Sequence, residues 1–249
     1  FLATTGEHRC GADTATMWLL NQDSTSACAY PPISWPDLEA LYLRAPIAAV
    51  PAPGMLAACA SKLLPVALRP LSRSLAAFVH QGVESDLQRR VRSIHPSSPN
   101  PHLLVVGCHD PGLPKRLAAP GWTLAAIGPR PAHPPADVEW IEGGTWDAVT
   151  RIPTDRSPDL IVLGEPLECW PDPGAVLRRL ALLLSPGGSL LISTPNLGSL
   201  LRKRLGPAWW LWGAPYRRFI LSRHALAELA TSAGLSLCDA ATFSDPADV

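Results

Sequence analysis

The sequence lacks the features of a membrane, zinc-binding or disulfide-rich protein. It has no run of about 18 apolar residues, so we expect no transmembrane helix. Its first residues do not follow the order of a signal peptide, which has a charged, then an apolar, then a small-residue segment, and we expect a cytoplasmic protein. Because Phe1 is not an initiator methionine, we also expect that residues precede it. The cysteines form no C-x-x-C pair and show no regular spacing, so we expect no metal site and free thiols. They are Cys10, Cys28, Cys59, Cys108, Cys169 and Cys238.

The chain also lacks an excess of charge of either sign. It carries 21 Lys and Arg against 21 Asp and Glu, so its formal net charge is zero. A nucleic-acid-binding protein needs a basic stripe, and we expect no nucleic-acid partner. We interpret the local cluster Arg202-Lys203-Arg204 as a solvated helix face rather than a phosphate or membrane site.

Proline is abundant, with 28 residues, which favours loops and rigid turns over long helices. The length of 249 residues is near the upper limit for one domain, so we expect one domain with an appendage. We predict a helical or irregular N-terminal segment over residues 1–98, with helices over 35–44 and 71–94 and a linker over 95–101. The main domain is then expected over residues 99–249.

A complete strand, helix and strand unit follows in the second half of the chain. The apolar run 159–163 predicts a strand buried on both faces, and Asp172-Pro173 marks the start of a helix whose apolar residues recur three and four apart. Ser185-Pro186-Gly187-Gly188 ends that helix, and residues 189–193 form the next strand. The order predicts a right-handed crossover in a parallel sheet.

Short motifs accompany this unit in a fixed order. They are Leu167-Glu168, Asp172-Pro173, Leu184-Ser185-Pro186-Gly187-Gly188, Pro195-Asn196, the tryptophans at 209, 210 and 212, and Ala233-Gly234-Leu235. The set resembles the class I S-adenosylmethionine-dependent methyltransferases, specifically their small-molecule and glycan-operon branch, over roughly residues 99–240. The resemblance implies a three-layer, Rossmann-like α/β fold with a mainly parallel sheet, and an N-terminal helical cap that helps to shape the acceptor pocket.

The resemblance places the cofactor loop after a strand over residues 103–106. There the family has a run of glycines that lets the backbone approach the cofactor, and this chain offers Gly107, Cys108, His109 and Gly112. His109 and Pro111 occupy the positions of two family glycines. We expect both to narrow the cofactor cleft.

Two further cofactor contacts of the family are altered in this chain. Strands over residues 122–127 and 138–141 are followed by Gly128 and Gly144, where the family places acidic residues that bind the ribose and the adenine. Losing two charged hydrogen bonds would weaken cofactor binding by roughly 3–6 kcal/mol, and Glu142 would compensate only by reaching back. Gly164 and Glu165, after the strand over residues 159–163, complete the implied S-adenosylmethionine site.

The resemblance also implies catalytic residues on the side of the site that binds the methyl acceptor. Family histidines are replaced by Cys169 and Arg217, which leaves His109 and Glu168 as candidates for proton removal. The alternative is that His109 only fills the space of a lost glycine, and that Glu168 makes a structural hydrogen bond. We expect His224 on the surface of a helix that begins after Ser222.

Two functions remain open from the sequence. The first is methyl transfer from S-adenosylmethionine to a small metabolite or sugar acceptor. In that case the aromatic segment around residues 209–219 either packs against the N-terminal cap or lines the acceptor pocket. The second is a catalytically inactive pseudo-methyltransferase whose scaffold binds a protein partner or a different ligand. A nicotinamide-dependent oxidoreductase is disfavoured because no G-x-G-x-x-G follows the first strand. We expect a last strand over residues 235–241.

Overall fold

The structure is a computed structural model that describes residues 2–5, 16–20, 26–30, 87–96, 98–143, 145–152, 157–165, 167–205, 211 and 217–241. The chain divides into two compact units. The first comprises Phe1–Asp86, Pro195–Arg223 and Ala240–Val249, and the second comprises Leu87–Thr194 and His224–Asp239. We describe each unit by itself.

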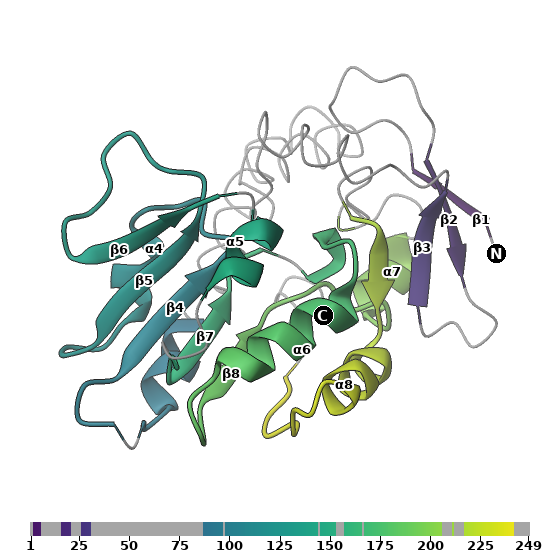
Figure 1. The fold of residues 1–249 in the computed structure, drawn as a ribbon. Helices are drawn as coiled ribbons and strands as arrows, with labels where there is room; N and C mark the ends of the chain where they lie inside the picture. The colour runs from purple at the N-terminus through teal and green to yellow at the C-terminus, as the bar shows by residue number, and fades with distance from the viewer. Residues whose placement is uncertain are drawn as a thin grey trace, which may run out of the picture. The chain divides into compact units, whose positions relative to one another are not determined.

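The second unit is built on a five-stranded sheet in which every pairing is parallel (Figure 1). The sheet order is β6-β5-β4-β7-β8, so the chain runs outward from the centre in one direction and then crosses to the other side. This topology and its flanking helices confirm the predicted Rossmann-like fold. The strands are β4 (His102–Val106), β5 (Thr123–Gly128), β6 (Val138–Glu142), β7 (Leu160–Leu163) and β8 (Ser189–Ile192).

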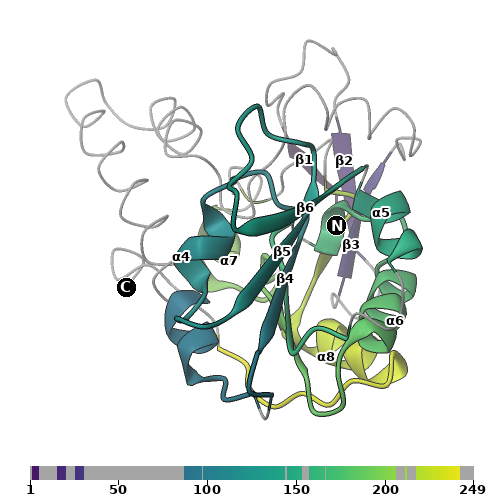
Figure 2. The ribbon, with the colours of Figure 1, turned by 60° about the vertical axis from the view of Figure 1, so that its left-hand side comes forward.

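Helices cover both faces of this sheet, which explains why its central strands are continuous apolar runs. Figure 2 shows α4 (Leu113–Leu117) on one side of the strands and α5 (Thr145–Arg151) and α6 (Pro173–Leu183) on the other. All four residues of β7 are buried, as are the last four of β4. On the α4 side, Val91 of a helix over residues 87–93 joins Leu103 and Val105 in one core cluster. Parallel sheets are buried in this way because their crossover helices cover both faces.

The crossover predicted from residues 159–196 is confirmed in detail. The side chain of Asp172 caps α6 by accepting a hydrogen bond from the backbone N–H of Ala175 at 2.9 Å, and Pro173 occupies the first turn. The turn after α6 places Gly187 at a φ of 79°, which a glycine adopts without a Cβ clash. A short 3-10 helix, Leu167–Cys169, lies between β7 and α6.

The first unit contains a four-stranded antiparallel sheet of order β1-β2-β3-β9. Asn196 forms a parallel bridge with Leu221, and the backbone N–H of Leu197 donates to the Leu221 carbonyl at 3.0 Å. The helix α7 (Leu200–Leu205) follows this bridge. The strands are β1 (Leu2–Thr5), β2 (Thr16–Leu20), β3 (Ser26–Tyr30) and β9 (Phe219–Leu221).

The expectation of a helical or irregular N-terminal segment was wrong for these three strands. β2 and β3 are joined in the sequence by five residues, Asn21–Thr25, that are rich in turn formers, and each strand contains an aromatic residue, Trp18 and Tyr30. The runs are too short for their periodicity to distinguish a strand from a helix. The helix predicted over 35–44 lies outside the described residues. Of the helix predicted over 71–94, residues 87–93 are described and are helical.

The strand expected over residues 235–241 was also wrong, because these residues form no helix or strand. The preceding helix α8 (Arg223–Ser232) begins directly after Ser222, as predicted, and the turn that follows it contains Gly234, whose φ is 80°. Leu237 is 53% exposed, and Asp239 forms an ion pair with Arg90. A strand needs a neighbour to satisfy its backbone groups, and the described residues give this segment none. The division after residue 98 stays a prediction.

Candidate functional site

The candidate site lies at the carboxyl edge of the parallel sheet, where open α/β sheets bind their ligands. The pairing register fixes which residues meet there. Val106, at the end of β4, is paired with Ile127 on one side and Leu163 on the other, and Gly128 is paired with Glu142. The loops that leave β4, β5, β6 and β7 therefore begin at the same level.

Glycine backbone packs closely against the neighbouring loop at the end of β4. Gly107 has a φ of 76°, and a Cβ at this position would lie 2.4 Å from the Cβ of Glu165. A Cβ at Gly164 would lie 3.1 Å from the Gly107 carbonyl oxygen, and the Gly164 N–H donates to the Val106 carbonyl at 2.8 Å. Gly107 therefore requires glycine for both space and conformation, whereas a side chain at position 164 would force a small shift of the loop after β4. Glu165 is buried against this joint, with 4% of its surface exposed.

The joint between β4 and β5 is equally close. The Cys108 N–H donates to the Ile127 carbonyl at 2.7 Å, and a Cβ at Gly128 would lie 2.2 Å from the Cys108 carbonyl oxygen. The Cys108 thiol is buried and donates to the Asp110 carbonyl at 3.1 Å. Burial, followed by the charge of Asp110, raises the pKa of Cys108 to about 12. The thiol therefore stays protonated at neutral pH and is no nucleophile.

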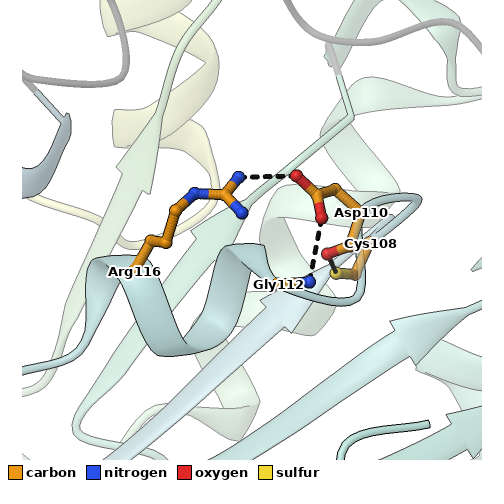
Figure 3. A network of polar contacts seen from close by, with 4 residues as sticks. All are labelled: Cys108, Asp110, Gly112 and Arg116. Carbon is orange, nitrogen blue, oxygen red and sulfur yellow. Dashed lines mark hydrogen bonds and ion pairs between the residues drawn. The ribbon is translucent and has the colours of Figure 1, made fainter. Parts of the chain in front are cut away.

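An internal polar network closes the loop that follows Cys108 (Figure 3). One carboxylate oxygen of Asp110 accepts from the Gly112 N–H at 2.8 Å, and the other accepts from Arg116 at 2.5 Å. The Asp110 carbonyl accepts from the Leu113 N–H at 3.0 Å. Gly112 immediately precedes α4, so Asp110 occupies the first donors of that short helix.

His109 lies at the start of this loop and is half-buried. Burial lowers the pKa of His109 below its ordinary value of 6.5, because an uncharged ring is favoured away from water. The imidazole is therefore neutral at pH 7 and can accept a proton. The position does not distinguish this role from simple space filling, and the catalytic role of His109 stays a prediction.

A carboxylate stands beside the end of β5, although β5 itself supplies none. Glu142, the last residue of β6, is the register partner of Gly128. Its Oε2 atom lies 3.9 Å from Nη1 of Arg130, and both side chains are about 60% exposed, at 61% and 59%. The indole of Trp140 donates to the Gly128 carbonyl at 3.3 Å. Gly144, the other expected contact, lies outside the described residues.

Glu168 and Cys169 follow β7 and are both fully buried. The Thr194 hydroxyl, beyond the end of β8, donates a hydrogen bond to Oε1 of Glu168. This contact ties the 3-10 helix to the end of β8 and is of the kind expected for a structural role. His224 is exposed at the start of α8, as expected, and lies 3.2 Å from Glu228.

A surface depression lies elsewhere in the described part of the chain. It has a volume of about 840 Å³ and is lined by residues at the amino ends of the strands, among them His102, Thr123 and Asp159. His102 and Thr123 begin β4 and β5, and Asp159 immediately precedes β7, whereas the glycine joints lie at the opposite ends. Because ligands of this fold class bind at the carboxyl edge, we assign no function to the depression.

Comparison with known families identifies the domain. A family described as "Methyltransferase domain" matches residues 77–239, which is more than half of the chain. The chain belongs to this methyltransferase family. The match includes all five parallel strands and α8.

Two solved structures are similar to the chain. One comes from the complex between the Haloferax volcanii Trm112 methyltransferase activator and a protein described there as a methyltransferase. The matched chain of that structure shares 16% identity with this one, and the TM-score is 0.49 over 68% of this chain and 80% of that chain. The other is PigF with SAH, with 18% identity and a TM-score of 0.48 over 72% of this chain and 57% of that one. A comparison with curated proteins finds no match.

The structure brings together most of the residues that the sequence assigned to the cofactor site of this methyltransferase domain. Gly107, Cys108, Gly128 and Gly164 contact one another directly or through Glu165. Sequence reasoning treated Glu142 only as a distant substitute. The signal that would have found it is its register beside Gly128, which depends on aligning the ends of two parallel strands.

The acceptor side is described only in part. The tryptophans at 209, 210 and 212 lie outside the described residues, so their role as packing or as a pocket lining stays a prediction. Arg217, which replaces a family histidine, belongs to the first unit and is fully buried there. Among the described residues, no three His, Cys, Asp or Glu side chains are placed to hold a metal ion, and no helix is both long and apolar enough to cross a membrane.

Proposed function

We propose that the protein binds S-adenosylmethionine at the carboxyl edge of its parallel sheet and transfers the methyl group to a small metabolite or sugar. The observation that carries the proposal is the pairing of Gly128 with Glu142 in a methyltransferase domain. It supplies a carboxylate one strand away from the end of β5. A carboxylate accepts several hydrogen bonds, so Glu142 is suited to bind both ribose hydroxyls.

The residues at this edge fit such a cofactor. Glu142 provides an exposed acceptor, and the missing side chain of Gly107 lets Glu165 pack against the loop that would hold the cofactor. When bound, S-adenosylmethionine supplies an electrophilic methyl group on a sulfonium ion. The chain's own contribution is to orient the acceptor and to exclude water from the reacting atoms.

His109 is the group that we assign to proton removal from the acceptor. Burial keeps its imidazole neutral at pH 7, so a ring nitrogen can take the proton that an acceptor hydroxyl or amine loses. Cys108 stays protonated and only fills the space beneath this loop. Glu168 accepts a hydrogen bond from Thr194, and we assign it a positioning role for the loop after β7.

Isothermal titration calorimetry with S-adenosylhomocysteine tests the cofactor site. We expect micromolar binding by the wild type and about tenfold weaker binding by Glu142→Gln, because a neutral amide makes weaker hydrogen bonds than a carboxylate. Glu139→Gln is the matched control: Glu139 lies on the same strand but pairs with Ala125, well before the carboxyl edge. Absence of heat up to millimolar ligand would overturn the proposal, and equal affinities in wild type and Glu142→Gln would overturn the role of Glu142.

A pseudo-methyltransferase that binds a protein partner is the alternative, and one observation favours it. One carboxylate oxygen of Asp110 already accepts from the Gly112 N–H and the other accepts from Arg116, so the Gly112 N–H is satisfied without a ligand. A His109→Gly/Pro111→Gly double variant tests this function by restoring the family glycines. Binding of S-adenosylhomocysteine by the double variant alone would support the inactive protein and locate the block in this loop.

A further inference from the structure

The edge of the sheet that carries Glu142 has no crossover helix to support it. β6 is the outermost of the five parallel strands, and β5 is its only neighbour among the described strands (Figure 1). Two adjacent parallel strands are usually joined through a helix that packs on the sheet. Here residues 129–137 connect β5 to β6 and form neither helix nor strand. The position of Glu142 therefore depends on contacts between the two strands themselves.

The connection between β5 and β6 adds little support of its own. It contains prolines at positions 129, 131, 134 and 135, and a proline has no backbone N–H to donate. Pro129 follows Gly128 directly, so the chain leaves β5 without a donor at its first residue. Arg130 pairs with Glu142 at 3.9 Å, but both side chains are more than half exposed, and such a surface pair holds a side chain only weakly.

Trp140 provides a contact that closes the joint between β5 and β6. Its indole Nε1–H donates to the carbonyl oxygen of Gly128, the last residue of β5, at 3.3 Å. Gly128 is the register partner of Glu142, whereas Trp140 itself pairs with Ala126, two residues before Gly128. The indole therefore reaches from β6 to β5 and toward the carboxyl edge, where it binds the residue that stands beside Glu142.

The same indole is held from below by the hydrophobic core. Trp140 is partly buried and packs against the core cluster that contains Ala126 and Val138. Residues two positions apart on a strand project from the same face, so Val138, Trp140 and Glu142 form one row along β6. Core packing fixes the ring, and the ring in turn fixes the end of β5 against the strand that carries Glu142.

We propose that Trp140 is a positioning residue for cofactor binding: its indole N–H holds the end of β5 against β6 and keeps the Glu142 carboxylate at the place where it meets the ribose hydroxyls. This inference rests on the proposed function, in which Glu142 binds the ribose. Trp140 acts through Gly128 and Glu142 and does not itself touch the ribose. Hydrogen bonds weaken steeply as their distance and angle depart from the preferred values, so a small displacement of Glu142 is enough to lower the affinity.

Calorimetric titration of the full chain with S-adenosylhomocysteine tests this role. Trp140→Phe keeps an aromatic ring in the core but removes the N–H group, and we expect it to bind about fivefold more weakly than the wild type. Trp122→Phe is the matched control, because Trp122 packs against the same core cluster but lies just before the amino end of β5. We expect this control to bind as the wild type does.

A double-mutant cycle separates positioning from a general loss of packing. Because Trp140 acts through Glu142, Trp140→Phe should weaken binding in the wild type but cause no further loss in the Glu142→Gln variant. Equal losses from Trp140→Phe in both backgrounds would overturn the positioning role, as would a Trp140→Phe variant that binds like the wild type. Absence of binding by the wild type would instead overturn the proposed function, and the positioning role with it.

Amide hydrogen exchange tests the contact without any ligand. Exchange at the Gly128 amide should be faster in Trp140→Phe than in the wild type and unchanged in Trp122→Phe. In the wild type, the indole N–H of Trp140 should exchange more slowly than that of free tryptophan. An indole N–H that exchanges as freely as in water would overturn the proposal even if Trp140→Phe fails to fold.

Discussion

Replacing Gly128 by alanine tests the packing at the carboxyl edge most directly. The added Cβ would lie 2.2 Å from the Cys108 carbonyl oxygen, 3.1 Å from its carbonyl carbon and 3.2 Å from its nitrogen. All three are backbone atoms, so no side chain can rotate away to make room. The Cys108 N–H is also hydrogen-bonded to Ile127, the neighbour of Gly128, at 2.7 Å. The ends of β4 and β5 must therefore separate.

The expected cost has two parts. Forcing an extra methyl group into a packed site costs about 1–3 kcal/mol. Leaving the buried Cys108 N–H without its acceptor adds about 1–3 kcal/mol. We therefore expect Gly128→Ala to lower the free energy of unfolding by roughly 2–6 kcal/mol, which is a large fraction of the stability of a typical domain.

Urea unfolding followed by circular dichroism measures this loss, and amide hydrogen exchange at Cys108 reports it locally. Gly121→Ala is the control, because a Cβ there would meet no atom within 4 Å. Its φ of 87° leaves only a conformational cost of about 1–2 kcal/mol. If Gly128→Ala unfolds like the wild type and keeps the Cys108 amide protected, the close approach of the two loops is wrong.

Two other predictions concern stability. Arg179→Met should lower the free energy of unfolding by about 1–3 kcal/mol, as measured by urea unfolding, because Arg179 donates to the Thr150 and Ile152 carbonyls at 3.2 and 2.5 Å. Arg178→Met should lower it by much less, because Arg178 is exposed. Equal losses in the two variants would contradict the role of Arg179 in binding these carbonyls. Because the pKa of His109 is lowered in the folded protein, the unfolded chain binds a proton at this residue first as the pH falls. The free energy of unfolding should therefore fall as the pH drops below about 6.5. Its dependence on pH, measured by urea unfolding across this range, should have a smaller slope in His109→Gln. An unchanged slope would show that His109 titrates as it does in water.

The sheet could be predicted from the sequence because its central strands β4, β5 and β7 are marked by buried apolar runs and the joints around α6 by local signals. Asp172 and Pro173 specify the start of α6, and Gly187 specifies the turn that follows it. The N-terminal strands lacked such signals, since β1, β2 and β3 contain at most five residues each. The segment over 235–241 shows the reverse error: a strand was expected there although the segment contains no β-branched or aromatic residue, and a strand also depends on a neighbouring edge.

The site was predictable where it depends on the backbone and not where it depends on register. Gly107 and Gly164 follow directly from the ends of two apolar runs. Glu142 could not be placed beside Gly128, because the sequence does not state how far each strand extends. Helical spacing also does not show that the guanidinium of Arg179 reaches the end of α5, a contact between residues 29 positions apart.

The close packing at Gly128 also explains why, in the proposed cofactor site, the carboxylate comes from the neighbouring strand. Any side chain at position 128 would collide with the Cys108 backbone, so an acidic residue cannot stand there without moving β4. Glu142 is the register partner of Gly128, and among the described residues it forms an ion pair with Arg130, at 3.9 Å with both side chains more than half exposed. Such a surface pair contributes about 0–1 kcal/mol, whereas two charged hydrogen bonds to ribose hydroxyls contribute roughly 3–6 kcal/mol. The balance favours the ribose, so Arg130 does not prevent Glu142 from binding it.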